Sequence, residues 1–154
     1  MQESKVRLGL NIAILTKKYF GVLTKELEHL DIERYFFVLV VIKENKAAST
    51  QQYLANTLQI DKVAMVKIME YLSEKGYVKR TRNLKDRREI HVQLTAKGNK
   101  KMEQIYKAIH KTNKEATAGL SEKQKSNFIK TLDVINHNLC GIPAKKMILE
   151  IKKS

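Results

Sequence analysis

The sequence contains few of the residues that interrupt helices or cross-link a chain. Its 154 residues include one cysteine, one proline, six glycines and no tryptophan. The single cysteine, Cys140, excludes an internal disulfide and a cysteine-rich zinc site. Together with His137, three residues earlier, it supplies too few ligands to hold a metal. The scarcity of proline and glycine predicts a helix-rich protein. The scarcity of metal ligands predicts no metal, and we expect no other cofactor.

Long apolar segments and enzymatic motifs are also absent. No run of about 18 apolar residues is available to span a membrane, and the polar residues 1–7 do not have the pattern of a signal sequence. We find no nucleophile motif, no phosphate-binding loop and no paired acidic group in an apolar setting. These absences predict a cytoplasmic protein that has no membrane partner and is not an enzyme.

The chain is strongly basic and still apolar enough to fold. Lysines and arginines number 30 against 16 acidic residues, a net charge of +14, and 43% of the residues are hydrophobic. The length and the apolar content predict one domain, or one domain with a helical extension. So large a positive charge favours an anionic partner. Lysines are scattered along the chain, whereas arginines cluster near residues 80–88.

The arginine cluster lies in residues 77–98, which have the pattern of a β-hairpin. Each strand alternates between two sets of side chains: Val78, Arg80 and Arg82 with Lys79 and Thr81, then Ile90, Val92 and Leu94 with His91 and Gln93. A period of two is typical of half-buried strands. The turn between the strands contains Lys85, Asp86, Arg87 and Arg88. A projecting hairpin with a cationic tip favours a nucleic acid partner, the alternative being an ordinary solvated hairpin.

Two helices are predicted at the start of the chain. The first, residues 6–30, has apolar side chains at three- and four-residue steps: Leu8, Ile12, Leu15, Tyr19, Val22, Leu23, Leu27 and Leu30. Asp31 is placed to cap the second, from Ile32 to about Glu44. Its stretch Tyr35–Ile42 also suits a strand by composition, but we favour a helix that is buried on nearly all sides.

Two shorter helices joined by a tight turn come next. The first, from Gln51 to about Leu58, is capped by Ser49 or Thr50, and we expect Tyr53, Leu54 and Leu58 on its inner face. The second starts at the cap Asp61 and ends at Gly76. Its apolar stripe consists of Met65, Ile68, Met69 and Leu72.

Two long helices follow the hairpin. Thr95 caps the first, from Ala96 to about Ala118, and Ser121 with Gln124 has the spacing of a capping box at the start of the second. This last helix, from Glu122 to about Leu139, has an apolar stripe of Phe128, Leu132, Ile135 and Leu139. The fold is therefore mainly α with a small β-hairpin wing: a winged helix-turn-helix flanked by long terminal helices.

The chain resembles the MarR family of transcriptional regulators from the first helix to about Leu139. The most specific part is DRREIHVQLTAKG, residues 86–98, which is similar to that family's wing. The resemblance implies that Asp86 braces the wing and that Arg88 reaches the DNA minor groove. It also implies dimerisation through the terminal helices, here Leu8, Ile12 and Leu15 with Phe128, Leu132, Ile135 and Leu139, and a small aromatic or phenolic effector.

The second short helix is the expected recognition helix, and its first turns are unusually apolar. Val63, Ala64 and Val66 cannot hydrogen-bond base edges, although they can pack against thymine methyls. We therefore expect an A/T-rich site that is recognised largely through groove shape and phosphate charge. The predicted DNA-contacting residues are Ser49, Thr50, Gln51, Gln52, Lys62, Val63, Ala64, Val66, Lys67, Arg80, Arg82, Lys85, Asp86, Arg87 and Arg88.

The predicted organisation has three parts: a dimerisation helix at residues 1–30, a DNA-binding lobe at 31–98, and dimerisation helices with a basic tail at 99–154. We expect a ligand-responsive repressor that binds a pseudo-palindromic duplex as a homodimer. One alternative is a winged-helix module that binds RNA or a protein through the same basic face. Another is a protein that binds an effector without any DNA site.

Overall fold

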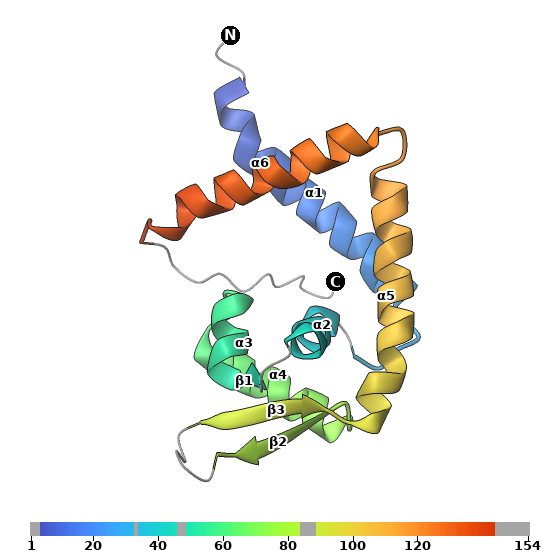
Figure 1. Ribbon diagram of the computed structural model, residues 1–154, viewed down its shortest axis with the longest axis vertical. Coiled ribbons are helices and arrows are strands. Elements are labelled where there is room, and N and C mark those ends of the chain that lie inside the picture. The colour runs from blue at the N-terminus through green and yellow to red at the C-terminus, as the bar shows by residue number, and fades with distance from the viewer. Residues whose placement is uncertain (1–3, 33, 46–48, 84–88, 144–154) are drawn as a thin grey trace.

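The computed structural model describes residues 4–32, 34–45, 49–83 and 89–143, and these ranges contain six α-helices and a three-stranded sheet (Figure 1). The elements are α1 (Ser4–Glu26), α2 (Phe36–Glu44), β1 (Ser49–Thr50), α3 (Gln51–Thr57), α4 (Lys62–Glu74), β2 (Val78–Arg82), β3 (Ile90–Leu94), α5 (Ala96–Ala116) and α6 (Glu122–Cys140). This architecture confirms the predicted fold, mainly α with a small hairpin.

The sheet combines the predicted hairpin with one short additional strand. The strands lie in the order β1-β3-β2, and both pairings are antiparallel. Val78 pairs with Leu94 at the base of the hairpin, and Ser49 of β1 pairs with Val92. A strand of two residues is too short to show an alternating pattern, so the sequence predicts only the hairpin.

Helix α2 is the centre of the hydrophobic core. Figure 1 views it nearly end-on, among α3, α4, the sheet and α5. Its buried side chains are Phe36, Val38, Leu39, Val40 and Ile42. A helix that is apolar on nearly all sides is stable only when other elements surround it, and the predicted helix, rather than a strand, is confirmed.

The connection between α1 and α2 differs from the prediction. Helix α1 ends at residue 26 rather than 30, and α2 begins at residue 36 rather than 32. In the turns between them the Ile32 amide donates to the Leu30 carbonyl at 2.8 Å. Asp31 does not cap α2, since Tyr35 precedes the first residue of that helix, and the Asp31 carboxylate accepts a hydrogen bond from Lys75 Nζ. Leu30 and Ile32 are nevertheless buried, so the apolar spacing predicts burial correctly and helix length incorrectly.

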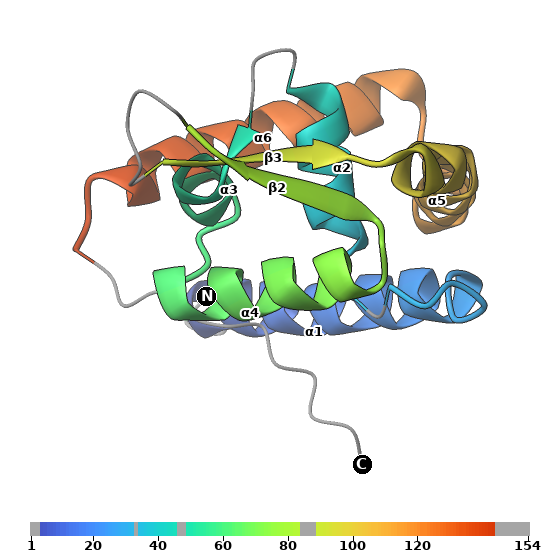
Figure 2. The same ribbon diagram turned by 90° about the horizontal axis from the view of Figure 1, so that it is seen from below.

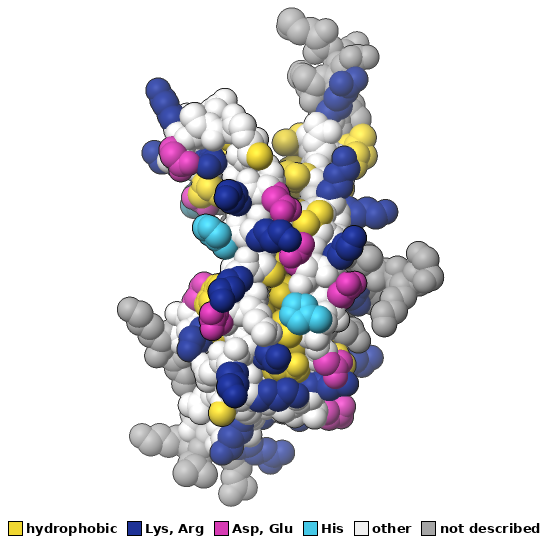
Figure 3. Space-filling view, turned by 90° about the vertical axis from the view of Figure 1, so that its right-hand side faces the viewer, with side chains coloured by type: hydrophobic (Ala, Val, Ile, Leu, Met, Phe, Trp, Pro, Cys, Tyr) yellow, Lys and Arg dark blue, Asp and Glu magenta, His cyan; other side chains and the backbone are white. Residues whose placement is uncertain are grey.

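The long helices extend from this core. In Figure 1, α5 runs along one side of the molecule from the sheet to the turn before α6. Helices α1 and α6 cross in Figure 1 but lie on different sides of the molecule in Figure 2. Figure 3 shows a cleft between two arms at this end, with hydrophobic side chains along it.

Candidate nucleic-acid interface

Helix α3 is capped by Thr50, whose Oγ1 accepts a hydrogen bond from the Tyr53 amide at 3.0 Å. Ser49, the other predicted cap, is buried in β1 and accepts a hydrogen bond from Asn45 Nδ2 at 3.1 Å. Its side chain therefore does not reach the surface, which corrects the predicted DNA contact. Leu54 is buried as predicted, whereas Tyr53 is exposed rather than facing inward.

A tight turn sets the direction of α4 relative to α3. The Ile60 amide donates to the Ala55 carbonyl at 2.9 Å, and Gln59 has a left-handed backbone with φ of 53°. The Gln59 Nε2 donates to the Asn56 carbonyl at 2.7 Å. Since a residue other than glycine is uncommon at positive φ, this side-chain bond helps to hold the turn.

Helix α4 has the features predicted for a recognition helix. The Asp61 carboxylate accepts a hydrogen bond from the Ala64 amide at 2.9 Å and caps the helix. The predicted stripe of Met65, Ile68, Met69 and Leu72 is entirely buried. By helical spacing Val63, Lys67 and Glu70 lie opposite this stripe, and Lys62 and Val66 lie at its flank. Lys62, Val63, Lys67 and Glu70 are exposed, and Val66 is partly covered. Val63 is the most exposed large hydrophobic side chain among the described residues, at 67%.

The two strands of the hairpin differ in burial, since β3 is mostly covered or partly covered and β2 is exposed beyond Val78. Val78 and Val92 are covered, whereas the β2 residues after Val78, Lys79 to Arg82, are all exposed. Because Lys79 and Arg80 point to opposite faces of the strand, β2 presents cations on both faces. The predicted set omitted Lys79; alternation in a half-buried strand does not indicate that both faces are solvated.

Glu89 joins the two strands at the end of the described hairpin. Its carbonyl accepts from the Asn83 amide at 2.9 Å, and its carboxylate accepts from Asn83 Nδ2 at 2.5 Å. His91 Nε2 lies 3.2 Å from the same carboxylate. The predicted wing residues Lys85, Asp86, Arg87 and Arg88 lie outside the described residues.

The two predicted glutamines at the start of α3 differ in their surroundings. Gln52 is exposed, and its Nε2 donates to Asn56 Oδ1 at 2.9 Å. Gln51 is half-buried, and its Oε1 is a buried acceptor without a partner in the described part of the chain. Gln52 is thus presented to solvent beside the exposed Tyr53, whereas Gln51 is mostly turned into the protein.

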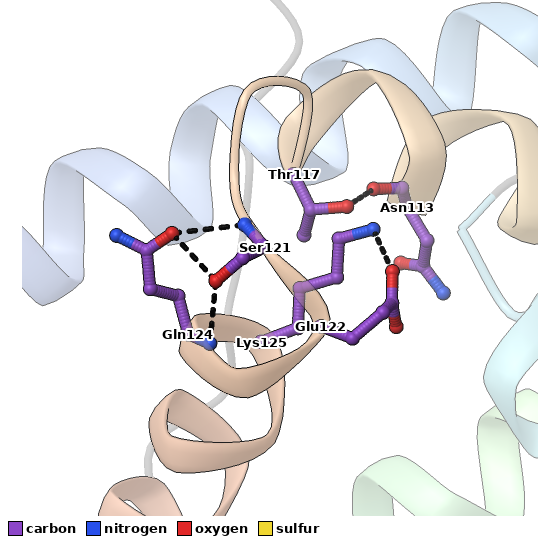
Figure 4. Close-up of polar contacts among 6 residues, drawn as sticks. All are labelled: Asn113, Thr117, Ser121, Glu122, Gln124 and Lys125. Carbon is purple, nitrogen blue, oxygen red and sulfur yellow. Dashed lines mark hydrogen bonds and ion pairs between the residues drawn. The ribbon is translucent and has the colours of Figure 1, made fainter.

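At the other end of the molecule, the predicted capping box forms at the start of α6. Figure 4 shows the reciprocal bonds: the Gln124 amide donates to Ser121 Oγ at 3.3 Å, and the Ser121 amide donates to Gln124 Oε1 at 2.8 Å. The preceding turn contains Gly119, whose φ of 80° favours glycine. These local features fix where α5 ends and α6 begins.

Helix α6 and the first half of α1 leave their apolar stripes uncovered. None of the residues of α6 is buried, although Ile135 is partly covered. The predicted dimerisation residues that are exposed are Leu8, Ile12, Leu15, Phe128, Leu132 and Leu139. Soluble monomers rarely expose an apolar surface this extensive, so it is a candidate for contact with another chain.

Comparisons with known proteins agree with this geometry. Residues 18–105 match the family model described as transcriptional regulator SarA/Rot. A MarR transcriptional regulator from Methanosarcina mazei Go1 is 26% identical, with a TM-score of 0.79 over 85% of this chain and 94% of that one. A cysteine-to-serine mutant of MarR from E. coli, complexed with operator DNA, is 28% identical, with a TM-score of 0.77 over 84% and 94%.

The fold is also shared with a more distant regulator. The transcriptional regulator SlyA has a TM-score of 0.78 at 22% identity, over 84% of this chain and 91% of that one. Within the described ranges, no helix is both long and apolar enough to cross a membrane. The same ranges contain no group of three or more histidine, cysteine or acidic side chains placed to hold a metal.

Proposed function

This chain belongs to the SarA/Rot family of transcriptional regulators, and we propose that it represses transcription as a homodimer on a pseudo-palindromic operator. It is a DNA-binding regulator with the MarR-type fold and is not an enzyme. One observation carries the DNA-contacting part of the proposal. Helix α4 exposes Lys62, Val63 and Lys67. The exposed strand β2 of the hairpin that follows contains Lys79, Arg80 and Arg82.

The two surfaces suit different parts of a DNA duplex. An α-helix fits the major groove, and the lysines at the start of α4 are placed to meet phosphates while Val63 meets base edges. A hairpin with exposed arginines fits the minor groove or the backbone beside it, where a narrow A/T-rich groove is most negative. Valine contacts with thymine methyls and arginine contacts with narrow grooves both favour A/T-rich operators.

The exposed stripes of α1 and α6 support the homodimer. A twofold dimer places two recognition helices one DNA turn apart, about 34–36 Å, and therefore selects a pseudo-palindromic site. Repression follows if the bound dimer blocks access to a promoter. A ligand that prefers another spacing of the helices releases the DNA, by no more than its difference in affinity for the two states.

An aromatic cluster supports the proposed effector. The Phe20 ring of α1 lies 5.6 Å from the Phe37 ring of α2, and the Tyr19 ring lies 6.1 Å from Phe20. Burial raises the pKa of Tyr19, whose hydroxyl donates to Asn113 of α5 at 2.6 Å. We propose that a small phenol binds here; phenol should raise the melting temperature of wild type more than that of Phe37→Ala, and an equal shift in both would contradict this site.

A salt titration tests the DNA-contacting surface. A duplex selected from a random library should bind with a logarithmic salt slope of about −0.9 for each phosphate neutralised. Lys67→Met should reduce the magnitude of this slope by about 1, whereas the matched control Lys114→Met, exposed on α5, should leave it unchanged. A protein partner in place of DNA would give no selected duplex, and an RNA partner would give tighter binding to RNA.

A further inference from the structure

The turn that begins α5, Thr95–Gly98, joins the hairpin to the end of the recognition helix. The Thr95 Oγ1 donates to the Gly76 carbonyl at 2.6 Å and accepts from the Gly98 amide at 3.0 Å. The Thr95 amide donates to the Tyr77 carbonyl at 3.0 Å. One residue therefore connects the stop of α4, the start of β2 and the first turn of α5.

Gly98 brings the first turn of α5 directly against the backbone of this junction. A Cβ atom added to Gly98 would lie far inside van der Waals contact with the carbonyl oxygen of Tyr77. Tyr77 is itself buried, so neither side can move away without disturbing the core. The glycine of the LTAKG segment is thus required for close contact between α5 and the end of α4.

Two lysines extend the junction at the surface. Lys97 Nζ donates to the Lys75 carbonyl at 2.6 Å and lies 4.5 Å from the centre of the Tyr77 ring. Lys75 Nζ in turn pairs with Asp31 at 2.5 Å, and this contact lowers the pKa of Asp31. Since exposed ion pairs contribute little individually, the bonds of Thr95 and the contact of Gly98 carry most of the constraint.

The angle at this junction has a large effect at the other end of α5. Helix α5 has 21 residues, so it is about 30 Å long, and each degree of rotation displaces its far end by roughly 0.5 Å. A rotation of about 7° therefore corresponds to one base-pair step of about 3.4 Å. Helix α5 leads into α6, which the proposed dimer uses.

We propose that Thr95 is a positioning residue that sets the separation of the two recognition helices by fixing the angle between α4 and α5. The inference rests on the proposed homodimer. This role of Thr95 differs from direct contact with DNA, because the Thr95 hydroxyl is hydrogen-bonded to the backbone of the junction. A variant that loosens this junction should tolerate more than one spacing of half-sites, whereas a merely destabilised variant should bind every spacing proportionally less.

The experiment compares duplexes that differ only in spacing. A duplex selected by the wild type is prepared with one base pair inserted or removed at its centre, and the ratio of affinities between the selected and altered duplexes is measured. Thr95→Val keeps the shape but loses the side-chain hydrogen bonds to Gly76, Tyr77 and Gly98. It should reduce this ratio about fivefold, equivalent to about one net hydrogen bond. Thr95→Ser retains the hydroxyl and should keep the wild-type ratio.

A second pair of variants covers the case in which Thr95→Val folds poorly. Lys97→Met removes the hydrogen bond to the Lys75 carbonyl and the contact with the Tyr77 ring, and should reduce the ratio about twofold. Lys107→Met, which breaks the exposed pair with Glu103 on the same helix, should not change it. A wild-type ratio in folded Thr95→Val, or in Lys97→Met if Thr95→Val is unfolded, would overturn the role of Thr95 and leave the proposed dimer standing. Absence of any spacing preference in the wild type would overturn the dimer, and this inference with it.

Discussion

Helices α4 and α6 have similar apolar stripes but opposite burial. The stripe of α4 from Met65 to Leu72 is entirely buried, whereas the stripe of α6 from Phe128 to Leu139 contains no buried residue. Helical spacing shows that a face needs to be covered, but it does not identify what covers it. In the central lobe, α2 through β3, the covering elements belong to the same chain; for α6 we propose that they belong to a second copy.

Helix α1 shows the same contrast within one element. Leu23 and Leu27, at its end and just beyond, are fully buried in the core. Leu8 and Ile12 are exposed at its start, although they continue the same three- and four-residue spacing. One end of the stripe therefore belongs to the lobe and the other to the proposed dimer surface.

The largest expected effect compares the same truncation in both regions. Leu39→Ala, in the middle of α2, should reduce the free energy of unfolding by about 2–5 kcal/mol, because it leaves a cavity in the core. Leu139→Ala should change the unfolding of a dilute, monomeric chain by less than about 0.5 kcal/mol. Urea denaturation at low protein concentration measures both, and equal losses would remove the contrast between the regions.

A charge on the α6 stripe should break the dimer without unfolding the lobe. Leu132→Asp should reduce the mass measured by light scattering from twice the chain mass of 17.8 kDa to that mass, since an unpaired buried carboxylate is costly. Ser126→Asp adds the same charge on a different face of α6 and should leave the mass unchanged. An unchanged mass in Leu132→Asp would argue against this surface.

Thr112 tests the contact between α1 and α5, where the two regions meet. It is buried, and its Oγ1 has no partner within the described residues. Its neighbours do bond α1, since Lys111 pairs with Glu26 at 2.8 Å. Thr112→Val replaces the hydroxyl with a methyl of similar size, so it should leave the free energy of unfolding unchanged or raise it by about 1 kcal/mol. A loss of that size in thermal unfolding would show that the hydroxyl is hydrogen-bonded.

The smallest expected effect concerns Val63 in the lobe. Replacing thymine by uracil removes one methyl group, worth about 0.8 kcal/mol, and should weaken wild-type binding about fourfold at the contacted positions. In Val63→Ala, replacing thymine by uracil should have little effect on binding, because the valine methyl groups that would contact the thymine methyl are absent. A fourfold loss in both proteins, measured by fluorescence anisotropy, would show that other residues contact the methyls.

Features determined by adjacent residues were predictable from the sequence. The caps Asp61 and Thr95, the capping box of Ser121 with Gln124, and the stop at Gly76 all occur as predicted. Each depends on hydrogen bonds or backbone preferences within a few residues, which a sequence pattern records.

Features determined by distant partners were not predictable. Asp31 resembles a helix cap but binds Lys75, which is 44 residues away. Ser49 is buried where it pairs with Val92 of β3 in the sheet. In the candidate interface, Lys62 and Lys67 are at the surface as expected, while the solvated second face of β2, with Lys79, was missed.

Footprinting on a selected duplex tests the central claim most directly, namely that one region contacts DNA and the other brings two copies together. Hydroxyl-radical footprints of the wild type should show two protected patches one helical turn apart, about 34–36 Å. Leu132→Asp should protect a single half-site at higher concentration, because its lobe is intact. Two equally protected patches in a Leu132→Asp protein that light scattering shows to be monomeric, or one patch in the wild type, would contradict the account.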